Sequence, residues 1–440
     1  MSRKLFGTDG VRGVAGEFLS AELALALGRA ATRRTGADRP QVLIVRDTRQ
    51  SGEMLQAALA AGVSAAGGDA LLGGVLPTPA APLLIGRYGF DLAAVLSASH
   101  NPYRDNGIKF FAADGYKLSD QDELAIEREM EEGAAGETPT EIGHIRELRG
   151  APEDYLRELH TRFADLDLSG HRIALDCANG ATYQVAPEIF RRLGAEVSVL
   201  ADKPDGRNIN AGCGSTHIGT LAQHVIEGSY EIGFAFDGDG DRMLAVDGEG
   251  EIVDGDELLA LATLHMRDSG RLAGNGVAVT VMTNYGFHAA MKDEGIDVAI
   301  TQVGDRYVLA ELRARDWMLG GEQSGHIIEM GFNRTGDGIA SALLTMEALG
   351  ERRLSERDGM RKLPQRLVNV PVRDRGALEG SQEVESAVQE ASHELAGRGR
   401  VLVRPSGTEP LVRVMVEAPT EPEAEEICGR LVALVERELG

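Results

Sequence analysis

One unit recurs along this sequence: an apolar run, a polar or glycine-containing loop, a helical stretch and a second apolar run. It begins at residue 41, again near residue 172 and a third time at residue 276. A strand, a helix and a second strand in succession predict a parallel strand pair, because parallel strands need a crossover connection. The starts lie too far apart for a short solenoid repeat, so they predict related domains of α/β architecture.

The 440 residues leave room for about three domains, at roughly 150 residues each. A stretch rich in Gly, Ala, Thr, Pro and charge, residues 132–152, predicts an exposed linker at the first boundary. After residue 364 the pattern changes to strands and helices that predict a small α+β domain. The predicted domains are residues 1–150, 151–254, 255–365 and 366–440.

Charge and cysteine usage narrow the classes of partner and compartment. The chain has 45 Lys and Arg against 69 Asp and Glu, a net charge of -24, so its field repels nucleic acid and anionic membranes. An anionic small substrate would need a local cluster of basic groups. Cys177, Cys213 and Cys428 have no C-x-x-C spacing, and no long apolar run appears, so we expect a cytoplasmic protein without disulfides or a membrane span.

Three carboxylates stand at alternate positions of one glycine-containing loop after the apolar run 232–236: Asp237, Asp239 and Asp241. Hard divalent cations such as Mg²⁺ prefer oxygen ligands of this kind. An EF-hand is excluded, because the sixth position is Arg242 and the twelfth is Gly248. The alternative is a solvated acidic turn, although three carboxylates on one loop repel each other without a cation.

Ser99 lies in a loop that follows the apolar run 92–96, at a strand end where α/β domains place active sites. A nucleophilic or phosphate-carrying serine fits this position, and a turn closed by Asn101 and Pro102 is the alternative. Lys109 follows among apolar residues, where desolvation is expected to lower its pKa toward acid or base use. A surface lysine with a buried stem is the alternative.

Two further loops also follow apolar strands. Bidentate guanidinium groups, hydroxyls and a glycine backbone make one of them a candidate phosphate cradle. Its residues are Arg404, Ser406, Gly407, Thr408 and Arg413. The other offers Glu322 and Ser324 to sugar hydroxyls and His326 for proton transfer. Ordinary tight turns are the alternative for both.

Together these four loops, residues 97–102, 237–242, 321–325 and 404–410, resemble the α-D-phosphohexomutase superfamily along essentially the whole chain. They match, in order, its phosphoserine, metal, sugar and phosphate loops. The segment 6–13 and Gln323 resemble the branch that acts on glucosamine phosphate. The resemblance implies four domains: three similar α/β domains with mixed, mostly parallel sheets and a smaller C-terminal α+β domain, with the active site in a central cleft.

The resemblance also implies the chemistry of an isomerase. Glucosamine 6-phosphate would become glucosamine 1-phosphate through a sugar 1,6-bisphosphate, which also acts as activator, feeding UDP-N-acetylglucosamine and cell-wall synthesis. Ser99 would carry the phosphoryl group and, with Asp237, Asp239 and Asp241, bind Mg²⁺. Lys109 and His326 would act as acid and base, and Arg12 and His100 would stabilise charge. The implied substrate-binding residues are Arg242, Asp305, Glu322, Ser324, Arg404, Ser406, Gly407, Thr408 and Arg413.

Some alternatives stay open at this point. Asp305 is also a candidate helix N-cap. The same loops suit a phosphoglucomutase or phosphomannomutase, a non-catalytic sugar-phosphate binder, or a metal-dependent phosphatase in which water attacks phosphoserine. The sequence is equally compatible with a monomer and a homodimer.

Overall fold

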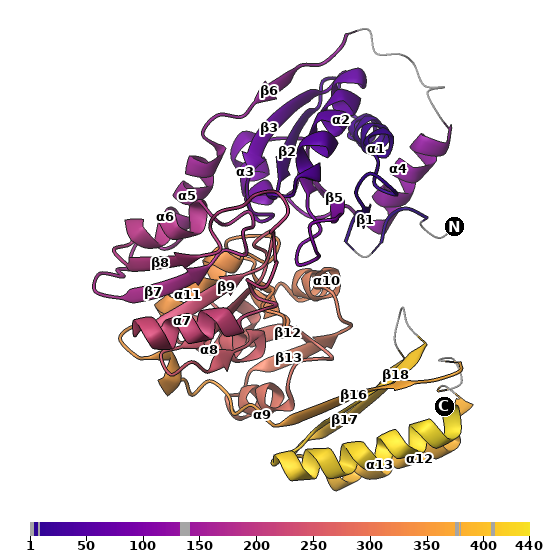
Figure 1. Cartoon of the computed structure of the whole chain (residues 1–440), viewed down its shortest axis with the longest axis vertical. Coiled ribbons are helices and arrows are strands. Elements are labelled where there is room, and N and C mark those ends of the chain that lie inside the picture. Colours follow the sequence, from indigo (N-terminus) through magenta and orange to yellow (C-terminus); the bar gives the residue numbers. More distant parts are fainter. Residues whose placement is uncertain (1–3, 8, 133–140, 375–377, 379, 406–409) are drawn as a thin grey trace. The chain divides into compact units, whose positions relative to one another are not determined.

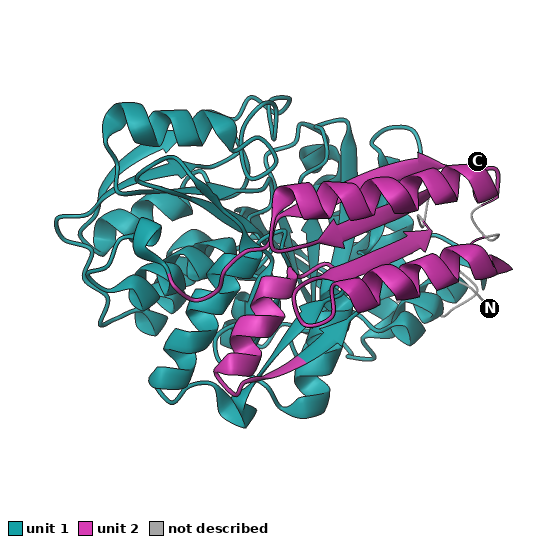
Figure 2. Cartoon of the chain, turned by 90° about the horizontal axis from the view of Figure 1, so that it is seen from below, with its two compact units in different colours: residues 1–281, 299–357 teal, residues 282–298, 358–440 magenta. Residues whose placement is uncertain are grey.

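The computed structural model describes residues 4–7, 9–132, 141–374, 378, 380–405 and 410–440. The chain divides into two compact units, shown in different colours in Figure 2. The first contains residues 1–281 and 299–357, and the second contains residues 282–298 and 358–440.

The first sheet of the chain has six strands, and helices pack against it (Figure 1). Its strand order is β1-β5-β4-β2-β3-β6. The pair of β2 with β3 is parallel, as predicted, and β2 also pairs in parallel with β4. The interior of β2 is fully buried, which suits a strand covered on both faces. Its elements are β1 (Val11–Val14), α1 (Ala21–Arg34), β2 (Gln41–Arg46), α2 (Ser51–Ala65), β3 (Asp69–Val75), α3 (Ala80–Tyr88), β4 (Leu92–Leu96), β5 (Asp105–Ala112), α4 (Asp120–Glu132) and β6 (Ile145–Glu147).

The predicted linker, residues 132–152, contains more structure than expected. Its strand β6 pairs in parallel with β3 at the edge of the first sheet, and α5 begins at Ala151. All three residues of β6 are exposed, so this strand has no apolar periodicity for the sequence to display.

The second sheet has five strands of mixed direction, in the order β11-β10-β9-β7-β8. The pair β7 and β8 is parallel, which confirms the second predicted strand-helix-strand unit. The elements are α5 (Ala151–Arg162), β7 (Arg172–Asp176), α6 (Val185–Arg192), β8 (Glu196–Leu200), α7 (Gly219–Gly228), β9 (Ile232–Phe236), β10 (Met243–Asp247) and β11 (Ile252–Val253).

The third sheet has four strands in the order β13-β12-β14-β15, and β12 and β14 are parallel. Its core gathers Trp317, Val308 and Leu312 against the sheet. The elements are α8 (Gly255–Asp268), η1 (Ala273–Asn275), β12 (Gly276–Thr280), α9 (Tyr285–Asp293), β13 (Asp297–Thr301), α10 (Asp305–Arg315), β14 (Leu319–Gly321), β15 (Ile327–Glu329), α11 (Gly338–Leu349) and η2 (Leu354–Glu356).

The C-terminal part is the small α+β domain that the sequence predicts. Its antiparallel sheet has the order β16-β18-β17, and two amphipathic helices cover it. The elements are β16 (Gln365–Pro371), α12 (Gln382–Glu394), β17 (Arg400–Pro405), β18 (Leu411–Glu417) and α13 (Glu421–Leu439).

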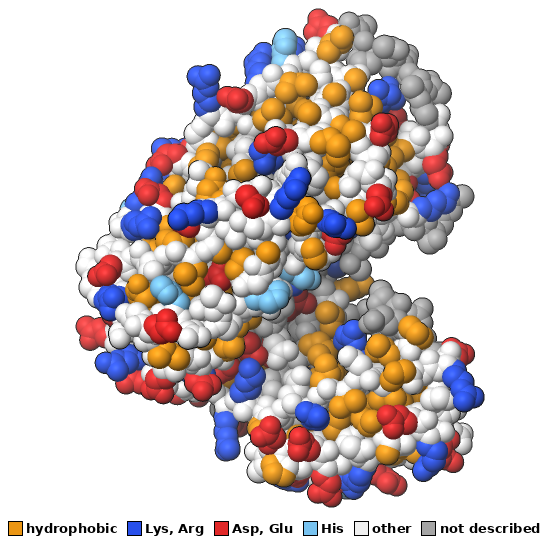
Figure 3. Space-filling view, viewed as in Figure 1, with side chains coloured by type: hydrophobic (Ala, Val, Ile, Leu, Met, Phe, Trp, Pro, Cys, Tyr) orange, Lys and Arg blue, Asp and Glu red, His pale blue; other side chains and the backbone are white. Residues whose placement is uncertain are grey.

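Charged side chains of both signs are interspersed over the face drawn in Figure 3, with scattered apolar ones between them. Among the described helices, none combines the length and the apolar character that crossing a bilayer requires. The three cysteines are buried and free.

Candidate active site

Three of the four predicted loops meet in the first compact unit, each directly after a strand. Ser99 comes after β4, Asp237 after β9 and Glu322 after β14. Ser99 Oγ donates a hydrogen bond to Asp237 Oδ2 at 2.5 Å. The backbone N–H of Met243, just past the aspartate loop, donates to the carbonyl of Gly325 at 3.1 Å. Polar loops at the carboxyl ends of strands are where α/β folds bind ligands.

Ser99 itself is buried and held in an unusual backbone conformation. Its side chain and backbone together are only 2% exposed, and its φ of 52° lies in the left-handed region. A non-glycine residue there costs roughly 1–2 kcal/mol and persists when its surroundings fix it. The hydroxyl also lies 3.4 Å from His100 Nδ1. The serine therefore presents one hydroxyl to the aspartate cluster from a strained turn.

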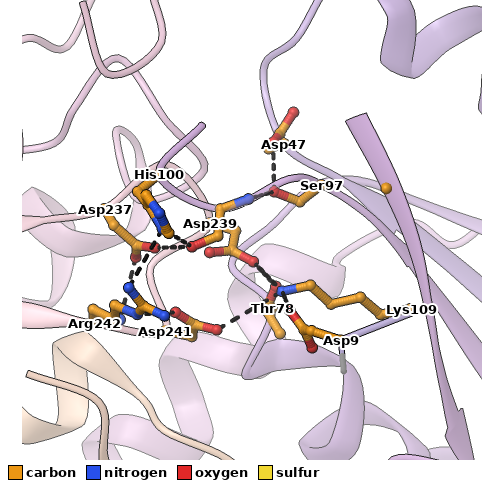
Figure 4. A network of polar contacts seen from close by, with 12 residues as sticks. Asp9, Asp47, Thr78, Ser97, His100, Lys109, Asp237, Asp239, Asp241 and Arg242 are labelled. Atoms are coloured by element: carbon orange, nitrogen blue, oxygen red, sulfur yellow. Dashed lines mark hydrogen bonds and ion pairs between the residues drawn. The ribbon is translucent and has the colours of Figure 1, made fainter. Parts of the chain in front are cut away.

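The three aspartates converge as the alternating pattern predicts (Figure 4). Their ligand oxygens all lie within 4.8 Å of one another, and all three side chains are buried. Burial, together with the neighbouring Asp241 and Asp239 carboxylates, raises the pKa of Asp237 well above its usual value. Such crowding of negative charge is unfavourable unless a cation compensates it.

The cluster fits a hard divalent cation. Asp239 Oδ1 and Asp241 Oδ1 are buried and have no hydrogen-bond partner within the described part of the chain. Buried carboxylate oxygens rarely remain unpaired, and oxygen ligands in this number suit Mg²⁺. The other oxygen of Asp239 is occupied, because Thr78 Oγ1 donates to it at 2.6 Å. Two buried carboxylate oxygens of the cluster thus remain without a hydrogen bond among the described residues and could bind a cation.

Lys109 corrects one expectation from the sequence. Its side chain is buried, yet its Nζ lies 2.8 Å from Asp239 Oδ2, 3.0 Å from Asp9 Oδ2 and 3.8 Å from Asp241 Oδ2. Burial alone would lower the pKa of Lys109, but the carboxylates of Asp239 and Asp9 raise it above its usual value. The prediction of a lowered pKa is therefore wrong, since the sequence could not show which carboxylates surround the ammonium group. Lys109 is a buried cation that offsets part of the acidic cluster.

A second lysine joins two distant segments of the first unit. Lys117 Nζ lies 2.6 Å from Asp9 Oδ1 and 2.5 Å from Asp305 Oδ2. Burial alone would raise the pKa of Asp9, but Lys109 and Lys117 hold it well below its usual value. Asp9 is thus shared by two ammonium groups, which connects the N-terminal segment to α10.

Asp305 is not the helix N-cap that the sequence allowed as an alternative. The N-cap of α10 is Gly304, and Asp305 is the first residue of the helix, with its carboxylate directed to Lys117. The same carboxylate lines a cavity beside the aspartate cluster.

This cavity has a volume of about 400 Å³ and is strongly charged. Its wall includes Ser99 and His326 together with carboxylates and guanidinium groups from the N-terminal segment, the aspartate loop, the start of α10 and the sugar loop. The charged residues of the wall include Asp9, Arg12, Asp241, Arg242, Asp305 and Glu322. A small, polar, charged ligand fits such a wall better than an apolar one does.

His326 lies at the cavity between two carboxylates. Its Nδ1 is 3.8 Å from Asp241 Oδ2 and its Nε2 is 3.8 Å from Asp305 Oδ2. Burial alone would lower the pKa of His326, but the hydrogen bond and charge of Asp241 raise it above its usual value. Its Nε2 accepts a hydrogen bond from the Gly336 N–H at 3.0 Å, so the proton of the neutral ring is assigned to Nδ1.

The remaining predicted charge-stabilising groups surround Ser99. Arg242 Nη1 lies 3.3 Å from His100 Nδ1, and burial together with Arg242 lowers the pKa of His100. The guanidinium of Arg12 pairs with the Asp9 carboxylate. Both guanidinium groups line the cavity, where they offer donors to an anion.

The predicted sugar loop is only partly directed into the cavity. Glu322 lines it and accepts a hydrogen bond from the Gly304 N–H at 2.9 Å. Ser324 Oγ is buried with no hydrogen-bond partner among the described residues. Gln323, whose identity pointed to the glucosamine branch, donates instead to Asp254 Oδ2 at 3.1 Å, at the beginning of α8.

The predicted phosphate loop lies in the second compact unit. Arg404 and Arg413 are directly opposite each other on β17 and β18, so two guanidinium groups flank the loop between these strands. Arg404 Nη2 also contacts Met282 Sδ at 3.5 Å. Ser406, Gly407 and Thr408 lie outside the described residues.

Several residues at the site were not expected from the sequence: Asp9, Lys117, Thr78, Asp47, Arg49 and Asn210. Asp9 belonged to the N-terminal segment that carried the resemblance, so a signal for it was present. Asp47 and Arg49 follow the apolar strand β2 directly, in the same position relative to a strand as the four loops. Thr78 and Asn210 lie in turns and Lys117 in an isolated bridge with Phe111, and none of the three carried a signal.

Four sequence profiles match the chain in order. They describe phosphoglucomutase/phosphomannomutase alpha/beta/alpha domain I at residues 3–137, domain II at 153–250, domain III at 254–367 and the C-terminal domain at 367–434.

Curated relatives match over nearly their whole length. A phosphoglucosamine mutase of Moorella thermoacetica is 50% identical over 436 residues, which cover 97% of this chain and 98% of the relative. A phosphoglucosamine mutase of Desulforudis audaxviator is 52% identical over 441 residues, with 98% and 97% covered.

Solved structures share the fold. A phosphoglucomutase/phosphomannomutase family protein from Burkholderia thailandensis has a TM-score of 0.83 at 23% identity, with 99% of this chain and 98% of that chain covered. Aspergillus fumigatus N-acetylphosphoglucosamine mutase in complex with GlcNAc-6P and magnesium has a TM-score of 0.70 at 17% identity, with 100% and 96% covered. At these identities the likeness concerns the fold alone.

Proposed function

The chain belongs to the phosphoglucomutase/phosphomannomutase family, and on this premise we propose that it interconverts glucosamine 6-phosphate and glucosamine 1-phosphate. It is an isomerase of the intramolecular phosphotransferase type. The observation that carries the proposal is the buried Ser99 hydroxyl, 2.5 Å from Asp237 in a cluster of three carboxylates beside a charged cavity. The names of the two curated relatives support an amino sugar as the substrate.

In the proposed reaction Ser99 carries the phosphoryl group that is exchanged. The sugar hydroxyl oxygen forms a bond to phosphorus while the bond between phosphorus and Ser99 Oγ breaks. The hydroxyl of the sugar loses a proton and the serine hydroxyl regains one, so the transfer balances without water. The resulting sugar 1,6-bisphosphate then returns its other phosphoryl group to Ser99 after it has turned over in the site.

Asp237, Asp239 and Asp241, with an oxygen on Ser99, would hold Mg²⁺, which when bound neutralises charge on the transferred phosphoryl group. The chain supplies further positive charge around the same point. Arg242 and Arg12 line the cavity and would pair with phosphoryl oxygens, and His100 adds a donor beside Ser99 Oγ.

For proton transfer we propose Lys109 and His326. Lys109 is a buried ammonium group that can donate a proton to a developing alkoxide. His326 has Nδ1 assigned as the protonated nitrogen, and its ring lines the cavity where the sugar hydroxyl would lie. The hydrogen bond from the Gly336 N–H to Nε2 orients the ring.

Substrate binding needs groups that tolerate both orientations of the sugar. Glu322 and Ser324 would accept and donate hydrogen bonds to vicinal hydroxyls, with Asp305 beside them. The phosphate that does not react would be bound by the phosphate loop, because paired guanidinium groups and hydroxyls suit a dianion. Its residues are Arg404, Ser406, Gly407, Thr408 and Arg413.

The proposal also covers the location, the oligomeric state, the activator and the domain bounds of the enzyme. The enzyme would work in the cytoplasm as a monomer or homodimer, be primed by a sugar 1,6-bisphosphate and supply UDP-N-acetylglucosamine synthesis. The four domains would be residues 1–150, 151–254, 255–365 and 366–440.

The test is isomerisation by the purified full chain with Mg²⁺ and a trace of sugar bisphosphate, comparing glucosamine, glucose and mannose 6-phosphates. We expect fastest turnover of the glucosamine ester. Ser99→Ala should lower kcat by at least about 10⁴-fold, because the acceptor of the phosphoryl group is lost. Ser392→Ala, an exposed serine on α12, is the matched control. Preference for another sugar, or steady release of inorganic phosphate, would contradict the proposal.

A further inference from the structure

The guanidinium group of Arg49 is completely buried beneath the Ser99 loop. All five of its N–H groups donate hydrogen bonds. Nε donates to Asp47 Oδ2 at 2.8 Å, and Nη2 donates to the carbonyls of Ser99 and Asn101, at 2.8 Å each. Nη1 donates to the carbonyl of Asp105 at 3.0 Å and to that of Pro102. One side chain therefore gathers four backbone carbonyls of the loop that follows β4.

The same network also holds the amide side of Ser99. The Ser99 N–H donates to Ser97 Oγ at 3.0 Å, and Ser97 Oγ donates to Asp47 Oδ2 at 2.6 Å (Figure 4). Because Asp47 Oδ2 also accepts from Arg49, the hydrogen bonds form a closed ring. It runs from the Ser99 N–H through Ser97, Asp47 and Arg49 back to the Ser99 carbonyl.

A second side chain fixes the same carbonyl from another part of the unit. Asn210 Nδ2 donates to the Ser99 carbonyl at 2.9 Å and to the Asn101 carbonyl at 3.1 Å. A carbonyl oxygen has two lone pairs, so Arg49 and Asn210 together saturate that of Ser99. The arrangement over-determines a backbone that would otherwise relax out of the left-handed region.

We propose that Arg49 is a positioning residue for Ser99: it locks the left-handed backbone that directs Oγ toward Asp237. This inference rests on the proposed function, in which Ser99 exchanges a phosphoryl group. Of the described residues that Arg49 hydrogen-bonds, only Ser99 lines the cavity, so Arg49 acts on the reacting oxygen through the backbone. A shift of about 1 Å in a reacting group can cost roughly 10²-fold in rate.

Lysine cannot replace this arginine. A guanidinium group is planar and presents its donors in a rigid fork, whereas an ammonium group has three donors in a compact tetrahedral head. Arg49→Lys keeps the charge opposite Asp47 but leaves loop carbonyls without donors. It should therefore fold and still lose activity.

The experiment measures kcat and KM for isomerisation, and Ser99 phosphorylation by a sugar bisphosphate followed by intact mass. Arg49→Lys and Arg49→Ala should each lower kcat and the phosphorylation rate by about 10²-fold, with KM unchanged because the cavity wall is intact. Millimolar guanidinium chloride should restore part of the kcat of Arg49→Ala. It should not raise that of the wild type.

Arg39→Ala is the matched control. Arg39 is 46% exposed and pairs with Asp69, away from the ring of hydrogen bonds, so its removal should leave kcat unchanged. Should Arg49→Ala fail to fold, Asn210→Ala removes the second donor to the Ser99 and Asn101 carbonyls, leaves Arg49 in place, and should lower kcat without altering KM.

Wild-type kcat in a folded Arg49 variant, or an equal fall in kcat and stability without guanidinium rescue, would overturn the inference. So would full activity of Asn210→Ala. If the wild type neither isomerises sugar phosphates nor gains a phosphoryl group, the proposed function itself fails and this inference falls with it. The wild-type measurement thus separates the two failures.

Discussion

Lys117 Nζ lies 2.5 Å from Asp305 Oδ2, joining the turn after β5 to the first residue of α10. The lysine side chain is 12% exposed, and it also contacts Asp9. Lys117→Met leaves both carboxylates without this cation, so the free energy of unfolding should fall by about 3–5 kcal/mol. Urea unfolding of the full chain measures the change.

Lys4→Met is the control for this prediction, because Lys4 forms an exposed pair with Glu131. Its removal should leave the free energy of unfolding nearly unchanged, since solvent screens such pairs. Similar losses for the two variants would contradict a special role of the buried lysine.

Removing charge from the aspartate cluster should have opposite effects with and without metal. Asp237→Asn relieves repulsion from Asp239 and Asp241, so metal-free protein should become more stable. Mg²⁺ should stabilise the wild type by about 2.7 kcal/mol at a concentration of about 100 times its Kd, and it should stabilise Asp237→Asn far less. Thermal unfolding with and without Mg²⁺ measures both effects. Glu249→Gln, at an exposed turn, serves as the control, and an equal Mg²⁺ effect in both proteins would refute the metal site.

His288 should make the stability of the chain depend on pH. Burial and the nearby Arg400 lower the pKa of His288 from 6.5 to about 4. Between these values the unfolded chain binds the proton more readily, so stability is complete above pH 6.5 and falls as the pH drops toward 4. The loss should be about 2 kcal/mol, discounted because the ring is partly exposed.

His288→Gln should flatten this part of the pH profile, as measured by denaturant unfolding across the same window. His393→Gln, on the exposed side of α12, should retain the slope because His288 is intact. An unchanged slope in His288→Gln would assign the effect to other groups.

Gly325 permits the close contact between the sugar loop and the strand after the aspartates. Its φ is 86°, and an added Cβ would lie 2.0 Å from the Met243 carbonyl oxygen. Gly325→Ala should therefore cost about 2–3 kcal/mol and lower kcat, because Glu322 and Asp241 separate. Gly89→Ala, with a φ of 72° and open space around it, should cost only about 1 kcal/mol. Equal losses in urea unfolding would show that the contact relaxes without cost.

The sequence predicted most of the framework because the relevant signals are local. The run 41–47, the stretch after it and the run near residue 70 became β2, α2 and β3, since burial on both faces requires continuous apolar strands. The small α+β domain after residue 364 also follows from local patterns of strands and helices. β6, a short exposed strand, was missed because its pairing depends on β3 and not on its own residues.

Within the site, what could not be predicted depends on partners distant in sequence. The carboxylates of Asp239 and Asp9 raise the pKa of Lys109. They lie 130 and 100 positions away in the sequence, so no local pattern could reveal them. Gln323, the residue that resembled the glucosamine branch, donates its side-chain hydrogen bond to Asp254 and not to a group of the cavity. The five hydrogen bonds of Arg49 could not be predicted, because four of their acceptors lie about 50 positions further along the chain. The roles of all these residues in catalysis stay predictions for the assays above.

The closed ring of hydrogen bonds around Ser99 bears on reversibility. A mutase turnover contains one donation and one return of a phosphoryl group at the same oxygen, so the nucleophile has to serve both half-reactions. The amide and the carbonyl of Ser99 are both anchored by hydrogen bonds with side chains of its own chain. A serine anchored in this way needs no reorganisation between donation and return, so the same backbone geometry serves the reaction in both directions.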